Sequence, residues 1–146
     1  MNILARQIES FTDIEDKLSF LCNASAMIKE SYKDTNWAGF YLFQKGQLHL
    51  GPFQGKVACT LIDIGKGVCG TSFQKKQLLN VKNVHLFEGH IACDSASNSE
   101  IVIPLIYGGK CFGVLDIDSE SFERFSDDDE LILQEVADII AKKLAQ

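Results

Sequence analysis

The sequence lacks the features that would assign it to a membrane or a secreted class. No apolar run approaches the roughly 20 residues that a membrane-spanning helix needs. The first stretch has no signal-peptide core, because Arg6, Glu9 and Asp13 interrupt it with charge. We therefore expect a cytoplasmic protein with no membrane partner.

Positive charge is also scarce. Lysine and arginine together number 14 against 20 aspartates and glutamates, which gives a net charge of -6. A nucleic-acid surface would need clustered basic side chains, so we expect no nucleic-acid partner. Internal repeats and low-complexity segments are absent as well. The 146 residues, 46% of them hydrophobic and 23% charged, suit one soluble globular domain.

Cysteine, by contrast, is plentiful. The chain has five, at positions 22, 59, 69, 93 and 111. An odd number without a secretory signal disfavours a structural disulfide framework. Metal binding, redox chemistry and packing as small hydrophobic side chains remain. We assign the packing role to Cys22, which adjoins a helical apolar stripe, and to Cys111, which has no polar neighbours in its strand.

Apolar periodicity and turn residues predict an α+β protein. A helix is expected over about 13–31, behind a capping box formed by Thr12 and Glu15, and a second helix is expected after Ser126. Residues 51–56 should be irregular, and no βαβ alternation is seen, which favours an antiparallel sheet. The expected strands are 37–43, 47–51, 57–64, 78–81, 100–106 and 111–117.

Residues 65–70 (GKGVCG) match the dinucleotide-binding pattern G-x-G-x-x-G. That motif needs a full crossover helix and then a parallel strand, and only 71–77 are available before the extended pattern resumes. The glycines are better explained as a loop that leads into a short helix. Cys69 would then lie near the helix N-terminus, where the dipole favours a thiolate.

Residues 82–99 form a long segment with little periodicity, and they contain His85, His90 and Cys93. Loops of this length in compact domains are usually functional or disordered. One hypothesis is a zinc site made by Cys59, Cys69, His90 and Cys93. The ten-residue spacing of the first two argues against it, because structural zinc ligands usually come in close pairs.

Three acidic residues in or beside strands are either exposed acids on a solvated face of the sheet or part of a site for thiol redox chemistry. Asp116 and Asp118 lie two apart on one strand and so share a face of the sheet, and Glu100 begins another strand. A pocket lined by all three would suit an ammonium group. Mutual repulsion would raise the pKa values of its carboxyls and let one of them donate a proton.

Six motifs occur in order along nearly the whole chain and together resemble the free methionine-(R)-sulfoxide reductases, catalytic members of the GAF-domain fold. The resemblance implies a single GAF domain over 1–146, with a central six-stranded antiparallel sheet and the N- and C-terminal helices packed on it. It also implies an oxidoreductase, commonly a homodimer, that acts in the oxidative stress response. The motifs are 36–41 (NWAGFY), 51–59 (GPFQGKVAC), 65–70 (GKGVCG), 89–94 (GHIACD), 99–104 (SEIVIP) and 113–118 (GVLDID).

The resemblance further implies roles for the cysteines. Cys93 attacks the sulfur of free methionine-R-sulfoxide and becomes a sulfenic acid while methionine leaves. Cys59 condenses with it into an intramolecular disulfide, with Cys69 as an alternative or second resolving thiol. Thioredoxin, as external reductant, then reduces the disulfide, and neither a metal nor an organic cofactor is needed.

By the same resemblance, the substrate pocket contains Glu100, Asp116 and Asp118. We assign Glu100 and Asp118 to the sulfoxide oxygen and Asp116 to the ammonium group, with Trp37 as a wall of the pocket and Tyr41 as a further contact. The alternative function is a non-catalytic GAF sensor of a small molecule. Sensor modules usually belong to longer chains with an effector domain, so a single-domain chain favours the enzyme.

Overall fold

The computed structural model describes residues 1–13, 16–90 and 96–146. Its helices are α1 (Ile3–Glu9), α2 (Lys17–Ser31), α3 (Gly67–Lys75) and α4 (Asp127–Leu144), with a short 3-10 helix, η1 (Val84–Leu86). The strands are β1 (Trp37–Gln44), β2 (Gln47–Gly55), β3 (Leu61–Asp63), β4 (Leu79–Val81), β5 (Ser99–Tyr107) and β6 (Lys110–Ser119).

The six strands form one sheet in the order β3-β2-β1-β6-β5-β4. Every neighbouring pair is antiparallel. Two tight turns join the hairpins β1–β2 and β5–β6, and both contain residues of positive φ, among them Gly46 and Gly109. The central pair, β1 and β6, joins segments far apart in sequence. The predicted six-stranded antiparallel α+β fold is confirmed.

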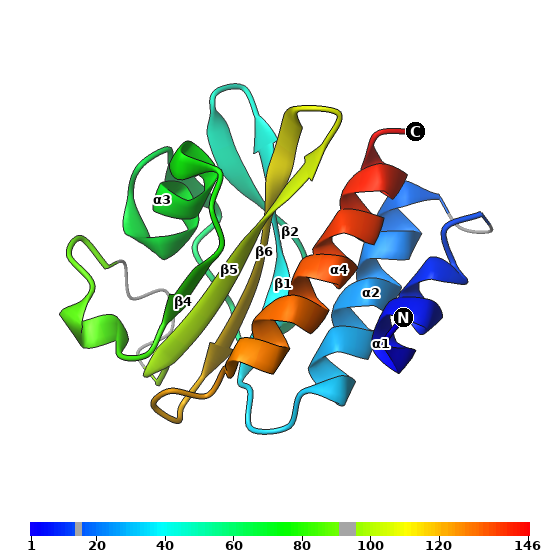
Figure 1. Cartoon of the computed structure of the whole chain (residues 1–146). Coiled ribbons are helices and arrows are strands. Elements are labelled where there is room, and N and C mark those ends of the chain that lie inside the picture. Colours follow the sequence, from blue (N-terminus) through cyan, green and yellow to red (C-terminus); the bar gives the residue numbers. More distant parts are fainter. Residues whose placement is uncertain (14–15, 91–95) are drawn as a thin grey trace.

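One face of the sheet is covered by the terminal helices. In Figure 1, α2 and α4 lie side by side on this face, and α1 packs beside them. Their apolar side chains and alternate residues of the central strands form the larger of two buried clusters. Its fully buried members include Ile8, Ile28, Phe40, Ile101, Ile103, Leu105, Leu115, Ile117, Leu133, Val136 and Ile140.

The N-terminal helix prediction was wrong about where the helix begins. The chain forms α1 first, and Thr12 Oγ1 donates to the Glu9 carbonyl at its end, 2.8 Å away. Helix α2 starts at Lys17 and is capped by Asp16, whose carboxylate accepts from the Ser19 amide at 2.9 Å. The proposed capping box with Thr12 is therefore wrong, and its partner Glu15 lies outside the described residues.

Two strand boundaries also differ from the prediction. Strand β2 runs through to Gly55, because its second half pairs with β1 across a bulge that places Phe53 opposite Gly39. The strand expected over 57–64 is reduced to β3, Leu61–Asp63, which pairs with the start of β2. Val57 is 88% exposed, so its apolar side chain does not hold the start of this segment in the sheet.

The second face of the sheet carries a smaller buried cluster, and α3 is the one α-helix that the described residues place over it. Figure 1 shows α3 on the opposite side of the sheet from α2 and α4. The cluster includes Trp37, Tyr41, Val68, Val102 and Val114. Within the part of the chain that the structure describes, no helix has the length and apolar character needed to cross a membrane.

Candidate active site

A cavity lies on the second face of the sheet, against the N-terminal turn of α3. It encloses about 520 Å³ of empty space, part of it open to solvent. Apolar side chains form its walls and acidic groups gather within it. The lining residues are Trp37, Tyr41, Val57, Ala58, Ile62, Lys66, Gly67, Val68, Cys69, His90, Ser97, Glu100, Asp116 and Asp118.

The sheet register brings the three predicted acidic residues together. Asp118 of β6 pairs with Glu100 of β5 on one side and with Trp37 of β1 on the other. Asp116 lies two residues back along β6 and therefore points to the same face. The predicted shared face of Asp116 and Asp118 is confirmed, and Glu100 joins them from the neighbouring strand.

Burial changes the protonation of two of these carboxyls. Glu100 is 7% exposed and Asp116 is 5% exposed, whereas Asp118 is half-buried. Loss of water raises the pKa of Glu100 well above its ordinary value, and the charge of Asp116 raises it further. The pKa of Asp116 rises for the same reason, with Asp118 as the second cause. The cavity therefore holds carboxylic acids that can donate a proton.

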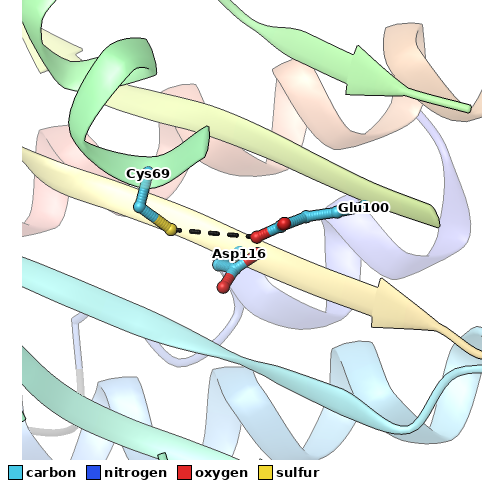
Figure 2. A group of neighbouring side chains, drawn as sticks. All are labelled: Cys69, Glu100 and Asp116. Carbon is cyan, nitrogen blue, oxygen red and sulfur yellow. Dashed lines mark hydrogen bonds between the residues drawn. The ribbon is translucent and has the colours of Figure 1, made fainter. Parts of the chain in front are cut away.

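Cys69 lies in the first turn of α3, as the glycine motif predicted. Its Sγ is 4.0 Å from Oε2 of Glu100 and donates to that oxygen (Figure 2). Burial raises the pKa of the Cys69 thiol well above its usual range, and the three nearby acids raise it further. The expectation of a thiolate here was wrong, because burial and acidic neighbours outweigh the helix N-terminus.

Two aromatic residues of β1 form the wall opposite α3. The Trp37 ring stacks between Phe53 and Tyr41, at centroid distances of 5.1 and 5.9 Å. Trp37 Nε1 donates to the Lys56 carbonyl at 3.1 Å, which fixes the plane of the indole. The predicted positions of Trp37 and Tyr41 beside the acidic residues agree with this geometry.

Tyr41 also holds the segment that contains Cys59. Its hydroxyl donates to the Cys59 carbonyl at 3.0 Å, and burial raises the pKa of Tyr41, so the hydroxyl keeps its proton. Cys59 itself is half-buried and disulfide-bonded. Cys22, Cys69 and Cys111 are free thiols.

The remaining predicted site residue, Cys93, lies outside the described residues. The residues on both sides of that gap line the cavity, since His90 precedes it and Ser97 follows it. Burial lowers the pKa of His90, with the nearby His85 as a second cause. His90 is therefore neutral over most of the physiological range.

The hypothetical zinc set of Cys59, Cys69, His90 and Cys93 is not the grouping found among the described residues. There, the side chains close enough to share a metal ion are Cys69, Glu100 and Asp116, with ligand atoms within 4.8 Å of one another. Glu100 and Asp116 had been considered only as partners of the substrate. Their proximity to Cys69 depends on the docking of α3 and has no signal in the local sequence.

The lining residues that were not predicted from the sequence include two with polar side chains, Lys66 and Ser97. Lys66, at the N-cap of α3, is the only lysine or arginine among the described residues of the lining. The Ser97 hydroxyl accepts a hydrogen bond from the side-chain amide of Asn36 at 3.0 Å. This contact ties the end of the segment 82–99 to the start of β1. Lys66 could have been suspected, since it lies between the glycines that shape the start of α3.

Over most of its length the chain is similar to proteins that contain a GAF domain. The GAF domain family model matches residues 12–144. Free methionine-R-sulfoxide reductase of Escherichia coli is 52% identical over 88% of this chain and 78% of its own length. The enzyme of the same name from Saccharomyces cerevisiae is 44% identical, over 96% of this chain and 84% of its own length.

A solved structure extends the similarity to three dimensions. The X-ray structure of free methionine-R-sulfoxide reductase from Neisseria meningitidis, in complex with its substrate, superposes with a TM-score of 0.93. The two sequences are 43% identical, and the match covers 97% of this chain and 86% of the other.

Proposed function

The chain belongs to the GAF domain family and, within it, to the free methionine-R-sulfoxide reductases, and we propose that it uses Cys93 to reduce free methionine-R-sulfoxide to methionine. The protein is an oxidoreductase. The observation that carries the proposal is the cavity beside α3, in which buried carboxylic acids lie between an aromatic wall and a cysteine-bearing helix.

Cys93 is the proposed nucleophile. Its thiolate attacks the sulfoxide sulfur, the sulfur–oxygen bond breaks, and the oxygen leaves with Cys93 as a sulfenic acid after taking up one proton. The substrate sulfur is thereby reduced and the cysteine sulfur oxidised. This assignment is supported by the position of His90 and Ser97, which flank the Cys93 segment in sequence and both line the cavity.

Glu100 is the proposed proton donor. Its carboxyl is buried and holds a proton because ionisation there would cost solvation free energy. Positioned acids of this kind typically accelerate a proton transfer by about 10²–10⁴-fold. Asp118, the strand partner of Glu100, would share the sulfoxide oxygen with it.

Asp116 is the proposed partner of the substrate ammonium group. Its Oδ1 is buried and accepts no hydrogen bond from any described residue, so the atom has unused capacity to bind a donor. A free amino acid brings an ammonium group that a peptide-bound residue lacks. The acidic cavity therefore favours the free substrate.

Cys59 is the proposed resolving cysteine. It condenses with the Cys93 sulfenic acid, and a disulfide and one water form. The disulfide-bonded state of Cys59, together with the free and fully buried thiol of Cys69, supports Cys59 over Cys69 in this role. Thioredoxin then reduces the disulfide by thiol exchange and is itself oxidised.

Several broader features belong to the same proposal. No metal or organic cofactor takes part, because the cysteines and carboxylic acids supply the nucleophile, the proton and the electrons. We also propose that residues 1–146 form one GAF domain, which the burial of Leu4, Ala5 and Ile8 of α1 in the main core supports. Finally, we propose that the enzyme is cytoplasmic and forms a homodimer.

The decisive test measures methionine formation from each epimer of free methionine sulfoxide, with thioredoxin, in the wild type and in Cys93→Ser. We expect turnover of the R epimer by the wild type and a loss of at least about 10³-fold in Cys93→Ser. The matched control is Cys111→Ser, which changes a free thiol outside the cavity lining and should keep its activity. Activity on neither epimer would favour the non-catalytic GAF sensor instead.

A further inference from the structure

The group Cys69, Glu100 and Asp116 has the composition of a metal site. One thiol and two carboxyls supply three ligand atoms within 4.8 Å of one another, and all three residues are buried. They come from three elements, α3, β5 and β6, and their side chains converge on one point (Figure 2). A convergence of this kind is set by the fold and does not depend on flexible surface side chains.

The group also contains a buried oxygen atom that no described residue satisfies. Asp116 is only 5% exposed, and its buried Oδ1 accepts no hydrogen bond from any described residue. Buried carboxylate oxygens in proteins are almost always satisfied by a donor or a cation. The half-buried Asp118 also lines the same cavity.

We propose that Cys69, Glu100 and Asp116 form an inhibitory binding site for a thiophilic divalent cation such as Zn²⁺, which excludes the substrate from the cavity. Zinc accepts sulfur and carboxylate oxygen together, at about 2.3 Å and about 2.0–2.2 Å, so its ligand atoms lie roughly 3–4 Å apart. The 4.0 Å between Cys69 Sγ and Glu100 Oε2 already approaches this separation.

The composition of the group selects the class of cation. A thiolate favours Zn²⁺ and Cd²⁺ over Mg²⁺ and Ca²⁺, which prefer sites made of oxygen alone. Lys66 is exposed and stands at the rim, so it does not neutralise the buried acids from within. A divalent ion would supply the positive charge that the group lacks and would release protons as it binds.

Metal binding and catalysis would exclude each other. An ion on Glu100 would occupy the carboxyl that we assign as proton donor, and an ion on Asp116 would occupy the proposed ammonium site. This competition rests on the proposed function. The binding of the metal itself does not, so the two can be tested separately.

The binding test is calorimetric titration of the oxidised protein with Zn²⁺. In this form Cys59 is held in its disulfide, and Cys22→Ser is introduced throughout to remove the exposed thiol that would bind metal on the surface. Cys69→Ser is compared with Cys111→Ser, which removes another buried free thiol away from the cavity. Circular dichroism and thermal melting check that both variants are folded.

We expect one Zn²⁺ per chain in the Cys111→Ser protein. Mutation of a residue that only hydrogen-bonds to a metal ligand typically lowers metal affinity roughly 10–100-fold. Cys69 is a proposed ligand itself, so Cys69→Ser should weaken Zn²⁺ binding by more than that. Cd²⁺ should produce the ultraviolet thiolate-to-metal absorption only when Cys69 is present. Equal affinity in the two variants, or no binding at all, would overturn the proposed site.

The competition test measures Zn²⁺ binding in the presence of free methionine-R-sulfoxide. We expect the apparent Zn²⁺ affinity to fall in proportion to substrate concentration, and a chelator to restore full turnover in the reduced enzyme. If Zn²⁺ binds through Cys69 but its affinity does not change with substrate concentration, the inhibitory role is overturned. If the enzyme proposal itself failed, the calorimetric dependence on Cys69 would still be observed.

Discussion

At the scale of single residues, burial decides the chemistry of the cavity. Glu100 and Cys69 both face water-poor surroundings, and burial raises the pKa of both side chains, which favours their protonated forms. For Glu100 the retained proton is useful, because the sulfoxide oxygen must be protonated. For Cys69 it makes the thiol a poor nucleophile in the free protein.

Replacement of Glu100 by glutamine should lower activity and raise stability. The pKa of Glu100 is higher in the folded than in the unfolded chain, so its contribution to stability is complete below the unfolded pKa and is lost as pH rises through the folded one. An uncharged amide avoids that loss. In Glu100→Gln, kcat should fall by about 10²–10⁴-fold.

Thermal melting across a pH series measures the stability part of this prediction. Near pH 8, the Tm of Glu100→Gln should exceed that of the wild type by roughly 2–4 °C for each kcal/mol that the substitution adds to the free energy of unfolding. The difference in Tm should vanish in acid. Glu88→Gln, which alters an exposed glutamate, is the control and should change neither property. A wild-type kcat in Glu100→Gln would exclude Glu100 as the proton donor.

The two candidate resolving cysteines can be separated by single-turnover kinetics. Cys59→Ser should release about one methionine per chain and then stop with thioredoxin as reductant, because no disulfide can form for exchange. Cys22→Ser, which changes an exposed free thiol, should recycle normally. Full thioredoxin-supported recycling by Cys59→Ser would transfer the role to Cys69.

Residue roles that follow from local spacing could be predicted from the sequence. Asp116 and Asp118 share a face because they lie two apart on a strand, and that inference needed no tertiary information. The protonated state of Cys69 could not be predicted in the same way. It depends on Glu100, which lies 31 residues away in sequence and reaches the thiol only through the fold.

At the scale of elements, helix α3 explains the glycine motif. Gly65 and Gly67 adopt φ values of +85° and +63°, which side chains disfavour, and they turn the chain from β3 into the helix. Gly70 serves a different purpose. A Cβ there would lie 2.4 Å from the Asp63 carbonyl oxygen, so only glycine lets the helix dock this closely to β3.

Gly70→Ala should therefore push α3 away from the sheet and displace Cys69, its neighbour in the helix. We expect a destabilisation of about 1–3 kcal/mol, typical of overpacking, measured by denaturant unfolding. The ratio kcat/KM should fall in the same variant, because α3 forms one wall of the cavity. Lys75→Ala, an exposed change on the same helix, is the control. An unchanged free energy of unfolding would contradict this account of Gly70.

Elements bounded by local signals were predicted well, and those bounded by pairing were not. The cap at Ser126 and the turn at Lys45 and Gly46 are encoded by the residues at those positions. The length of β2 is set by its partner β1, and α1 packs against α4 at the other end of the chain. Neither partner could be identified from the short stretch of sequence itself.

At the scale of the whole molecule, one face of the sheet carries the main hydrophobic core and the other carries the candidate active site. The face toward α1, α2 and α4 is closed by apolar side chains and carries the larger core. Among the described residues, the other face is covered by the single α-helix α3, and the cavity lies beside it. The strand order that creates this division could not be predicted from the sequence, because the pairing of β1 with β6 has no local signal.

The charge of the molecule and of its cavity predicts how substrates are selected. The chain carries a formal net charge of -6, and three of its carboxyl groups lie in the cavity, within reach of any ligand. A cationic ammonium group is favoured there. Acetylation of the substrate nitrogen removes the charge and leaves Asp116 Oδ1 without the donor that we assign to it.

N-acetylmethionine-R-sulfoxide should therefore be reduced with a kcat/KM about 10–100-fold lower than that of the free amino acid. This factor follows from the roughly 1.5–3 kcal/mol that a hydrogen bond to a charged group contributes. The methyl ester of methionine-R-sulfoxide keeps the ammonium group and should lose less. Because Asp116 is the proposed partner, Asp116→Asn should narrow the difference between the free and the acetylated substrate. An acetylated substrate reduced as fast as the free one would show that the cavity does not recognise the ammonium group.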